Sequence, residues 1–240
     1  MNDDETKDSI LPPQLSPEEI HRIIKSKVHR IDREFTGAFE FISKYDKSVT
    51  FFGSARFDEN NDHYQKARQL AKKISELGYT ILTGGGGGIM EAANRGAIEA
   101  GKESLGLNIR LPKHQPLNSY ITNSMQFDYF FVRKVALSFA AEAYLFFPGG
   151  FGTFDEFFEI LTLIQTRKIR RVPIILVGAD YWNELNLFIK NIMLGKHHSI
   201  KEEDMKLYTI TDNEDEIIEI IKQVPIRPMI HGNEHTTQNS

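Results

Sequence analysis

Glycines and carboxylates stand together in the run from Pro148 to Glu156, PGGFGTFDE. Glycines lack a Cβ, so backbone N–H groups at such a turn can converge on an anion, and a helix that starts there adds positive potential. The run ends on two acids, Asp155 and Glu156. A carboxylate close to a bound phosphate is unexpected for simple anion binding, but cleavage of a glycosidic bond needs one. The run therefore predicts a phosphate-binding site with an acidic group beside it.

Glu156 also has a purely structural interpretation. Thr153 and Glu156 have the spacing of a capping box, in which a glutamate three residues after the cap bonds back to the cap residue. On spacing alone, this capping role is the favoured one. Asp155 is expected to point about 100° away from Glu156 on the helix, so the two acids need not form a catalytic pair.

Two further turns contain glycine after an apolar stretch. They are Gly53-Ser54 and the five glycines from Gly84 to Gly88, among which Gly85 and Gly86 are candidates for phosphate contacts. Ser54 could donate to a phosphate or could only satisfy its own turn. Neither turn matches the P-loop or the dinucleotide fingerprint, which disfavours a kinase, an ATPase and an NAD-dependent enzyme. Tight turns without a ligand are the alternative, but two glycine-rich turns on one sheet, Gly84–Gly88 and Gly149–Gly152, favour an anion site.

The elements that must position these turns alternate between apolar strands and amphipathic helices. This alternation predicts a doubly wound, Rossmann-like α/β fold, a mostly parallel sheet with helices on both faces. Ligands bind such sheets at the carboxyl ends of the strands, where the strand order reverses. Strands are expected at residues 49–52, 79–82, 104–109, 127–131, 144–147, 172–177 and 207–210. Helices are expected at residues 62–77, 89–100, 132–141, 153–167, 181–194 and 213–223.

The chain before the sheet has a different character. Residues 1–15 are charged and proline-containing and are expected to be disordered, and Ser16-Pro17-Glu18-Glu19 predicts the start of a helix that runs to about Tyr45. The apolar stripe of this helix must be covered by the main domain or by another subunit. The predicted organisation is a leader and helix over residues 1–45, a Rossmann-like domain over 46–225 and a mobile tail over 226–240.

Composition narrows the class of protein. The 240 residues are 40% hydrophobic and 26% charged, which is ordinary for a soluble globular protein. The net charge of −4 argues against nucleic-acid or anionic-membrane partners, and the absence of cysteine excludes disulfides and thiolate chemistry. No apolar run could span a bilayer and no secretory signal is evident, so a cytoplasmic protein is expected. No metal site is predicted, because carboxylate partners at ligand spacing are lacking for His63, His114, His197, His198 and His231.

Four segments together resemble one family. Pro148–Glu156 matches the PGGxGTxxE motif of the Lonely Guy phosphoribohydrolases, proteins often mislabelled as lysine decarboxylases. FGSAR at Phe52–Arg56, TGGGGGIMEAANRGA at Thr83–Ala97 and FFVRK at Phe130–Lys134 extend the resemblance, and the long first helix resembles the extended bacterial branch. The chain departs from shorter relatives at Phe130-Phe131, where they carry Met-His, and at Glu91, where many carry glycine. These departures bear on substrate preference more than on the reaction.

The resemblance implies hydrolysis of a nucleoside 5′-monophosphate, of the AMP or N6-prenyl-AMP type, to a free base and ribose 5-phosphate. It implies no cofactor, and it makes the domain at 46–225 nucleotide-binding and catalytic. The implied catalytic pair is Arg133 and Glu156, in a homodimer or larger assembly with its sites close to the subunit interface. Nucleotide contacts are implied for Lys134, Gly149, Gly150, Phe151, Gly152, Thr153 and Thr162. Without the resemblance, Arg133 and Lys134 would be interpreted as a solvated basic pair.

Two other functions compete with this hypothesis. Molybdenum-cofactor carrier proteins resemble this chain in fold and glycine turns, but their function does not require hydrolysis. The presence of both Arg133 and Glu156 favours an enzyme. DNA binding is opposed by the acidic composition and by the lack of a basic stripe interleaved with aromatics. The released base is left open: Met90, Phe130, Phe131 or a neighbouring subunit could form an apolar pocket for a prenyl group, or these residues could be core.

Overall fold

The computed structural model describes residues 15–111 and 116–226. The expected leader up to residue 14, the expected tail from residue 227, and His114 and His231 lie outside these ranges, so those predictions are not tested.

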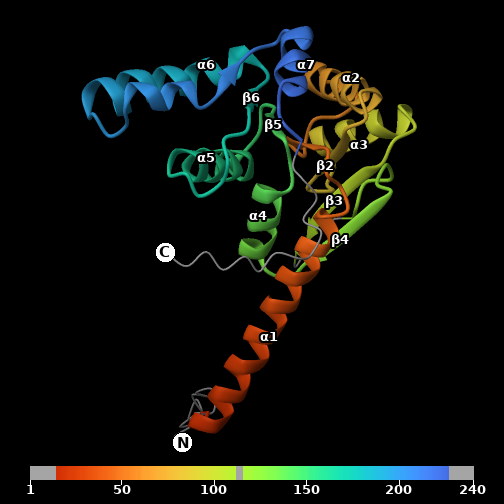
Figure 1. Ribbon diagram of the computed structural model, residues 1–240, viewed down its shortest axis with the longest axis vertical. Helices are drawn as coiled ribbons and strands as arrows, with labels where there is room; N and C mark the ends of the chain where they lie inside the picture. The colour runs from red at the N-terminus through yellow and green to blue at the C-terminus, as the bar shows by residue number, and fades with distance from the viewer. Residues whose placement is uncertain (1–14, 112–115, 227–240) are drawn as a thin grey trace, which may run out of the picture.

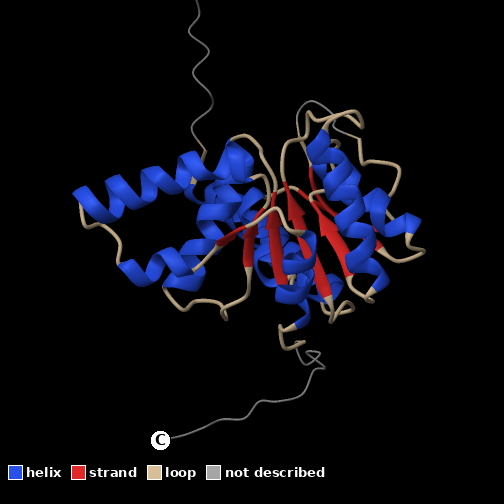
Figure 2. Ribbon diagram, turned by 90° about the horizontal axis from the view of Figure 1, so that it is seen from above, coloured by secondary structure: helices blue, strands red, loops and turns tan. Residues whose placement is uncertain are grey.

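A seven-stranded sheet forms the centre of the molecule (Figure 2), and every neighbouring pair of strands in it is parallel. The strands are β1 (Ser48–Phe52), β2 (Thr80–Thr83), β3 (Ser104–Ile109), β4 (Asn123–Phe127), β5 (Ala143–Phe146), β6 (Ile174–Leu176) and β7 (Thr209–Ile210). Their order is β4-β3-β2-β1-β5-β6-β7, so the chain moves outward from β1 and then returns to β5 on its other side. This confirms the doubly wound fold and places the reversal of strand order between β1 and β5.

Helices cover both faces of the sheet. The helices are α1 (Pro17–Ile42), α2 (Asp62–Glu76), α3 (Ile89–Glu99), α4 (Phe130–Phe139), α5 (Phe151–Gln165), α6 (Ala179–Phe188), the π-helical η1 (Ile189–Lys196), the 3-10 helix η2 (Glu202–Lys206) and α7 (Glu214–Lys222). One buried cluster joins the sheet to α1, α4, α5 and α6, and a second joins it to α2, α3 and α7. Because both faces are covered, the central strands are buried throughout, which explains their continuous apolar runs.

Two predicted boundaries are wrong, and one predicted helix is divided between two helix types. The strand expected at residues 127–131 is β4 at Asn123–Phe127, an edge strand in which exposed polar residues interrupt the apolar ones, so it lacks the continuous apolar run of the central strands. Phe130 and Phe131 already belong to α4. The helix expected from Thr153 begins at Phe151 instead, and the helix expected at 181–194 is α6 continued by η1.

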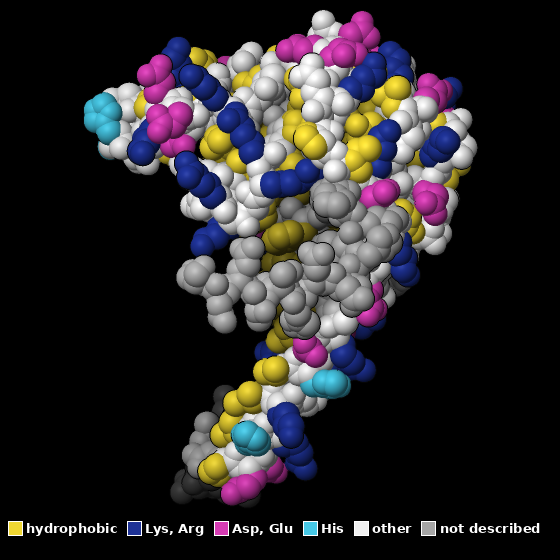
Figure 3. All heavy atoms as spheres, viewed as in Figure 1, with side chains coloured by type: hydrophobic (Ala, Val, Ile, Leu, Met, Phe, Trp, Pro, Cys, Tyr) yellow, Lys and Arg dark blue, Asp and Glu magenta, His cyan; other side chains and the backbone are white. Residues whose placement is uncertain are grey.

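Helix α1 begins as its sequence predicts. The Ser16 hydroxyl oxygen accepts from the Glu19 amide at 3.2 Å, and the Glu19 carboxylate accepts from the Ser16 amide at 2.8 Å. Its C-terminal part packs on the body through Ala38 and Ile42, whereas its N-terminal part projects away from the body (Figure 1). Hydrophobic side chains line one side of the projecting part (Figure 3), where Ile20, Ile23, Ile24 and Val28 are exposed. The main domain therefore covers only part of the apolar stripe. Among the described residues, no helix is both long and apolar enough to cross a membrane.

Close packing of α3 on α2 yields a stability prediction. A Cβ at Gly96 would clash with the Arg68 carbonyl oxygen and would lie 2.9 Å from the Lys72 amide nitrogen. Gly→Ala inside a helix usually stabilises by up to about 1 kcal/mol, but overpacking costs about 1–3 kcal/mol, so we expect Gly96→Ala to lower the free energy of unfolding in urea.

Gly37→Ala is the matched control, because a Cβ there would meet only the flexible end of Met125, at 3.3 Å. We expect its stability to be unchanged or increased. An equal loss in both variants would contradict the packing explanation.

Candidate active site

A cleft of about 940 Å³ opens at the carboxyl ends of β1 and β5, where the strand order reverses. The turn after β1, the turn after β2, the glycine turn before α5, α4 and the start of α6 all contribute residues to its lining. The lining residues are Phe52, Gly53, Ser54, Ala55, Arg56, Phe57, Asn61, His63, Gly84, Met90, Phe130, Arg133, Pro148, Gly149, Gly150, Phe151, Gly152, Thr153, Asp155, Glu156, Asp180 and Tyr181.

The glycine turn leaves the start of α5 open. Gly150 is the N-cap and provides no side-chain cap, and the amides of Phe151 and Gly152 have no acceptor among the described residues. A Cβ at Gly150 or Gly152 would meet nothing within 4 Å, whereas one at Gly149 would lie 2.7 Å from the Thr153 Cβ. Gly149 is therefore required for packing, and the space above the helix end can admit an anion.

The capping interpretation of Glu156 is wrong. Because α5 begins at Phe151, Thr153 is the third residue of the helix and Glu156 is the sixth, too far along to bond to the cap. The Thr153 side chain is buried against Gly149 instead. The Thr-x-x-Glu spacing has no capping meaning inside a helix, so the carboxylate is free for another purpose.

Glu156 is a buried acid with an unpaired oxygen. Its side chain is 7% exposed, and its Oε2 atom has no hydrogen-bond partner. Burial raises the pKa of Glu156 to about 7, a shift that the positive charge of Arg133 opposes and the negative charge of Glu159 reinforces. Both protonation states are therefore populated near neutral pH, the condition that suits a group that exchanges protons or stabilises developing charge.

Arg133 is the cation that faces Glu156. Its Nε donates to the Leu107 carbonyl at the end of β3, at 2.7 Å, and no described hydrogen bond uses its terminal nitrogens. A Cβ at Gly84 would clash with one of these nitrogens, so the guanidinium occupies space that a glycine provides. Burial lowers the pKa of Arg133, although an arginine stays charged at neutral pH. The structure thus brings Arg133 and Glu156 into one cleft.

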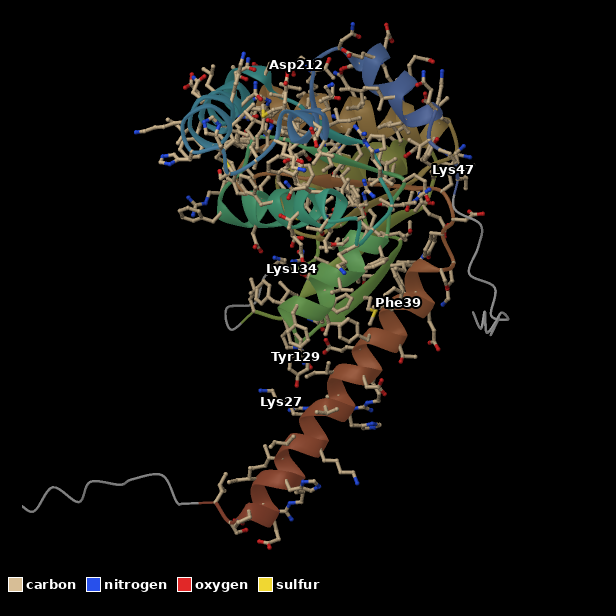
Figure 4. The ribbon with its side chains drawn as sticks, turned by 60° about the vertical axis from the view of Figure 1, so that its left-hand side comes forward. Lys27, Phe39, Lys47, Tyr129, Lys134 and Asp212 are labelled. Carbon is tan, nitrogen blue, oxygen red and sulfur yellow. The ribbon has the colours of Figure 1, made fainter. Side chains whose placement is uncertain are left out.

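Lys134 and Thr162 lie outside the cleft. Lys134 (labelled on α4 in Figure 4) pairs with Asp155 at 2.8 Å and with Glu159 at 3.1 Å. Thr162 lines a separate shallow hollow on α5. The alternative of a solvated basic pair is also wrong. Arg133 lies in the cleft, and Lys134, whose side chain is only 19% exposed, is ion-paired.

The other glycine-rich turns have mainly structural hydrogen bonds. The Gly85 amide donates to the Thr83 hydroxyl at 2.9 Å, and Asn118 donates to the carbonyls of Gly85 and Gly86. Neither glycine lines the cleft, although Gly84 does. Ser54 lines the cleft with Gly53, and its hydroxyl oxygen accepts from the Arg56 amide at 3.1 Å, so it satisfies its own turn.

Several residues that line the cleft are not among the site residues predicted from the sequence. Asp180 and Tyr181 lie in the first turn of α6, which follows β6, and the rule that ligands bind beyond strand ends could have indicated them. Phe57 stacks on His63 with ring centroids 5.8 Å apart, a pairing without a local sequence signal. In the described ranges, no three His, Cys, Asp or Glu side chains gather as they would around a metal ion.

Comparison with known proteins agrees with this geometry. Residues 90–221 match the family model described as possible lysine decarboxylase. The chain is 28% identical to the cytokinin riboside 5′-monophosphate phosphoribohydrolase LOG2 of Arabidopsis thaliana, over 61% of this chain and 70% of the relative. It is 26% identical to the probable cytokinin riboside 5′-monophosphate phosphoribohydrolase LOG4 of Oryza sativa subsp. japonica, over 72% of this chain and 75% of the relative.

Solved structures share the fold. The molybdenum cofactor binding protein of Rippkaea orientalis has a TM-score of 0.53 at 20% identity, covering 73% of this chain and 93% of its own. The molybdenum cofactor carrier protein of Chlamydomonas reinhardtii has a TM-score of 0.52 at 21% identity, covering 74% and 97%. Since the family model spans more than half of the sequence, the chain belongs to the possible lysine decarboxylase family, the family of the LOG phosphoribohydrolases.

Proposed function

We propose that the protein hydrolyses the N-glycosidic bond of a nucleoside 5′-monophosphate, of the AMP or N6-prenyl-AMP type, to the free base and ribose 5-phosphate. The observation that carries this proposal is the buried, unpartnered carboxylate of Glu156 within two turns of the open N-terminus of α5. An open helix end suits the 5′-phosphate, and a nearby carboxylate suits the ribose. The names of the plant relatives describe action on cytokinin riboside 5′-monophosphates.

The proposed mechanism assigns separate tasks to the cleft. The glycine turn and the amides of Phe151 and Gly152 hold the phosphate, which places the ribose beside Glu156. As the bond from C1′ to the base nitrogen breaks, positive charge develops on the ribose, and the Glu156 carboxylate stabilises it or orients the attacking water. The water oxygen bonds to C1′ and gives up a proton, and the base leaves with the electron pair of the broken bond and takes up a proton, so that none is gained or lost overall. Arg133 favours the ionised form of Glu156 and can also contact the phosphate.

The cleft does not suit the reaction in the family's description. A pyridoxal-phosphate decarboxylase needs a lysine that forms a Schiff base with the cofactor. None of the described residues that line the cleft is a lysine. The neighbouring Lys134 does not line the cleft, and its ammonium group is held by the carboxylates of Asp155 and Glu159.

A carrier of a phosphate-bearing cofactor is the competing proposal, because the solved neighbours are named for binding the molybdenum cofactor. A carrier needs the glycine turn but gains nothing from a buried, unpaired carboxylate opposite an arginine. The enzyme is therefore the proposal that uses all of the cleft.

The apolar side of the cleft bears on the base. Met90 and Phe130 line the cleft and can contact an apolar N6 substituent, whereas Phe131 packs against Phe35 and Tyr129. A prenylated adenine therefore suits this cleft at least as well as adenine.

We further propose a homodimer that pairs the outer surfaces of α5. Phe151 is 96% exposed, and the hollow beside it is lined by Phe154, Phe158, Thr162 and Leu163. Exposed apolar patches of this kind mark interaction sites. Thr162, which lies outside the cleft of its own subunit, would lie at that interface.

Sedimentation velocity should give about twice the 27.5 kDa chain mass, and Leu163→Asp should give the monomer. Leu187→Asp, at an exposed leucine of α6 outside this hollow, should stay dimeric; a monomeric wild type contradicts this proposal.

Removing either member of the proposed catalytic pair tests the reaction. We expect Glu156→Gln and Arg133→Ala to lower kcat/KM for AMP and N6-prenyl-AMP by about 10²- to 10⁴-fold, because each removes charge that acts on the transition state. Released ribose 5-phosphate is the readout.

Glu214→Gln is the control and should keep wild-type activity, because Glu214 begins α7 and its carboxylate pairs with Lys73 of α2 rather than lining the cleft. Wild-type kcat/KM in either cleft variant would refute the assignment of the pair. Tight AMP binding by the wild type without any product would support the carrier instead.

The raised pKa of Glu156 also predicts a pH-dependent stability difference. Between pH 4.5 and about 7 the unfolded chain loses this proton while the native protein keeps it, so the stability that this group contributes is lost as pH rises. The Glu156→Gln side chain cannot ionise. The free energy of unfolding of this variant should therefore exceed that of the wild type by about 3 kcal/mol above pH 7 and should equal it near pH 4.5. Urea denaturation across this range measures the difference; a constant difference would show that Glu156 titrates normally.

A further inference from the structure

Tyr181 connects α6 to the glycine turn. Its hydroxyl donates to the Gly149 carbonyl at 2.6 Å, across 32 positions of sequence. Burial raises the pKa of Tyr181, so the phenol keeps its proton at neutral pH and remains a donor. The ring packs against Phe154 at 6.0 Å and Trp182 at 5.1 Å, which fixes where the hydroxyl lies.

The glycine turn needs an external restraint. Gly149 and Gly150 are adjacent residues without a Cβ, so the peptide between them can rotate with little steric hindrance. In a trans peptide the carbonyl and the following amide point in opposite directions. A bond that fixes the Gly149 carbonyl therefore also fixes the direction of the Gly150 N–H at the start of α5.

The start of α6 is itself firmly held. The Asp212 carboxylate accepts from the amides of Gly178 and Ala179, both at 2.9 Å, and pairs with Lys66 of α2 at 2.9 Å. Asp212 follows β7 and is labelled in Figure 4. The Trp182 indole N–H, one residue after Tyr181, donates to the Phe146 carbonyl at 3.1 Å. Tyr181 therefore projects from a helix end that cannot shift easily.

We infer that Tyr181 is a positioning residue that holds the Gly149–Gly150 peptide in its phosphate-binding orientation, and that Asp212 supports it by fixing the start of α6. The inference rests on the proposed function only in taking the ligand of the glycine turn to be a phosphate ester. It adds α6 and the turn after β7 to the elements that determine phosphate affinity.

Calorimetric titration with ribose 5-phosphate tests the inference without requiring hydrolysis. Tyr181→Phe keeps the ring and removes the hydroxyl, and should raise the Kd about tenfold, the effect of losing one hydrogen bond worth about 1.4 kcal/mol. In turnover assays the same variant should raise KM for AMP while kcat changes less than twofold. Asp212→Asn keeps one acceptor and should give a smaller rise in Kd.

Tyr208→Phe is the matched control, because its hydroxyl donates to Asn186 at 2.8 Å and the residue does not line the cleft. Its Kd should equal that of the wild type. An unchanged Kd in Tyr181→Phe, or a rise matched in Tyr208→Phe with a shared loss of Tm, would overturn the inference. If the wild type binds ribose 5-phosphate but releases no base from AMP, the proposed reaction fails and the Kd comparison still decides the role of Tyr181.

Discussion

A buried carboxylate that lacks a hydrogen-bond partner is the constraint on which the site depends. An ionised Glu156 is unfavourable in a low-dielectric cleft unless a cation lies nearby. Arg133 from α4 provides that charge, the Leu107 carbonyl of β3 orients it, and Gly84 after β2 leaves room for it. Three segments far apart in the sequence thus combine to hold the pKa of Glu156 at about 7.

The parallel sheet makes this convergence possible. Since all strands run in one direction, the turns after β1, β2 and β5 meet at one edge, and the reversal between β1 and β5 separates the helices enough to leave a cleft. In the proposed reaction, the open end of α5 holds the phosphate, and Glu156 on the same helix acts on the ribose that this phosphate carries. A rigid helix therefore sets the separation between phosphate and acid. The arrangement lowers stability at neutral pH, as is common for sites that keep a group poised for chemistry.

The sequence predicts the architecture well because the pattern of buried strands and amphipathic helices is local. It fails at β4, where an edge strand has polar side chains, and at Glu156, where Thr-x-x-Glu mimics a cap although the helix starts two residues earlier. The ion pairs of Lys134 and the hydrogen bond from Tyr181 depend on neighbours distant in sequence, so no motif encodes them. Family resemblance directs attention to Arg133 and Glu156, but only the fold shows that both lie in the cleft while Thr162 does not.

Direct titration of the Glu156 carboxyl group is the measurement closest to the central claim. Carbon-13 NMR of glutamate-labelled protein, with Glu156→Gln to identify the signal, gives its pKa without assuming any substrate or reaction. The account predicts a pKa of about 7 that rises further when Arg133 is replaced by alanine, because burial raises the pKa and Arg133 lowers it. A value near 4.5, unaffected by Arg133→Ala, would mean that the acid is solvated and uncoupled from the arginine, and would contradict the account.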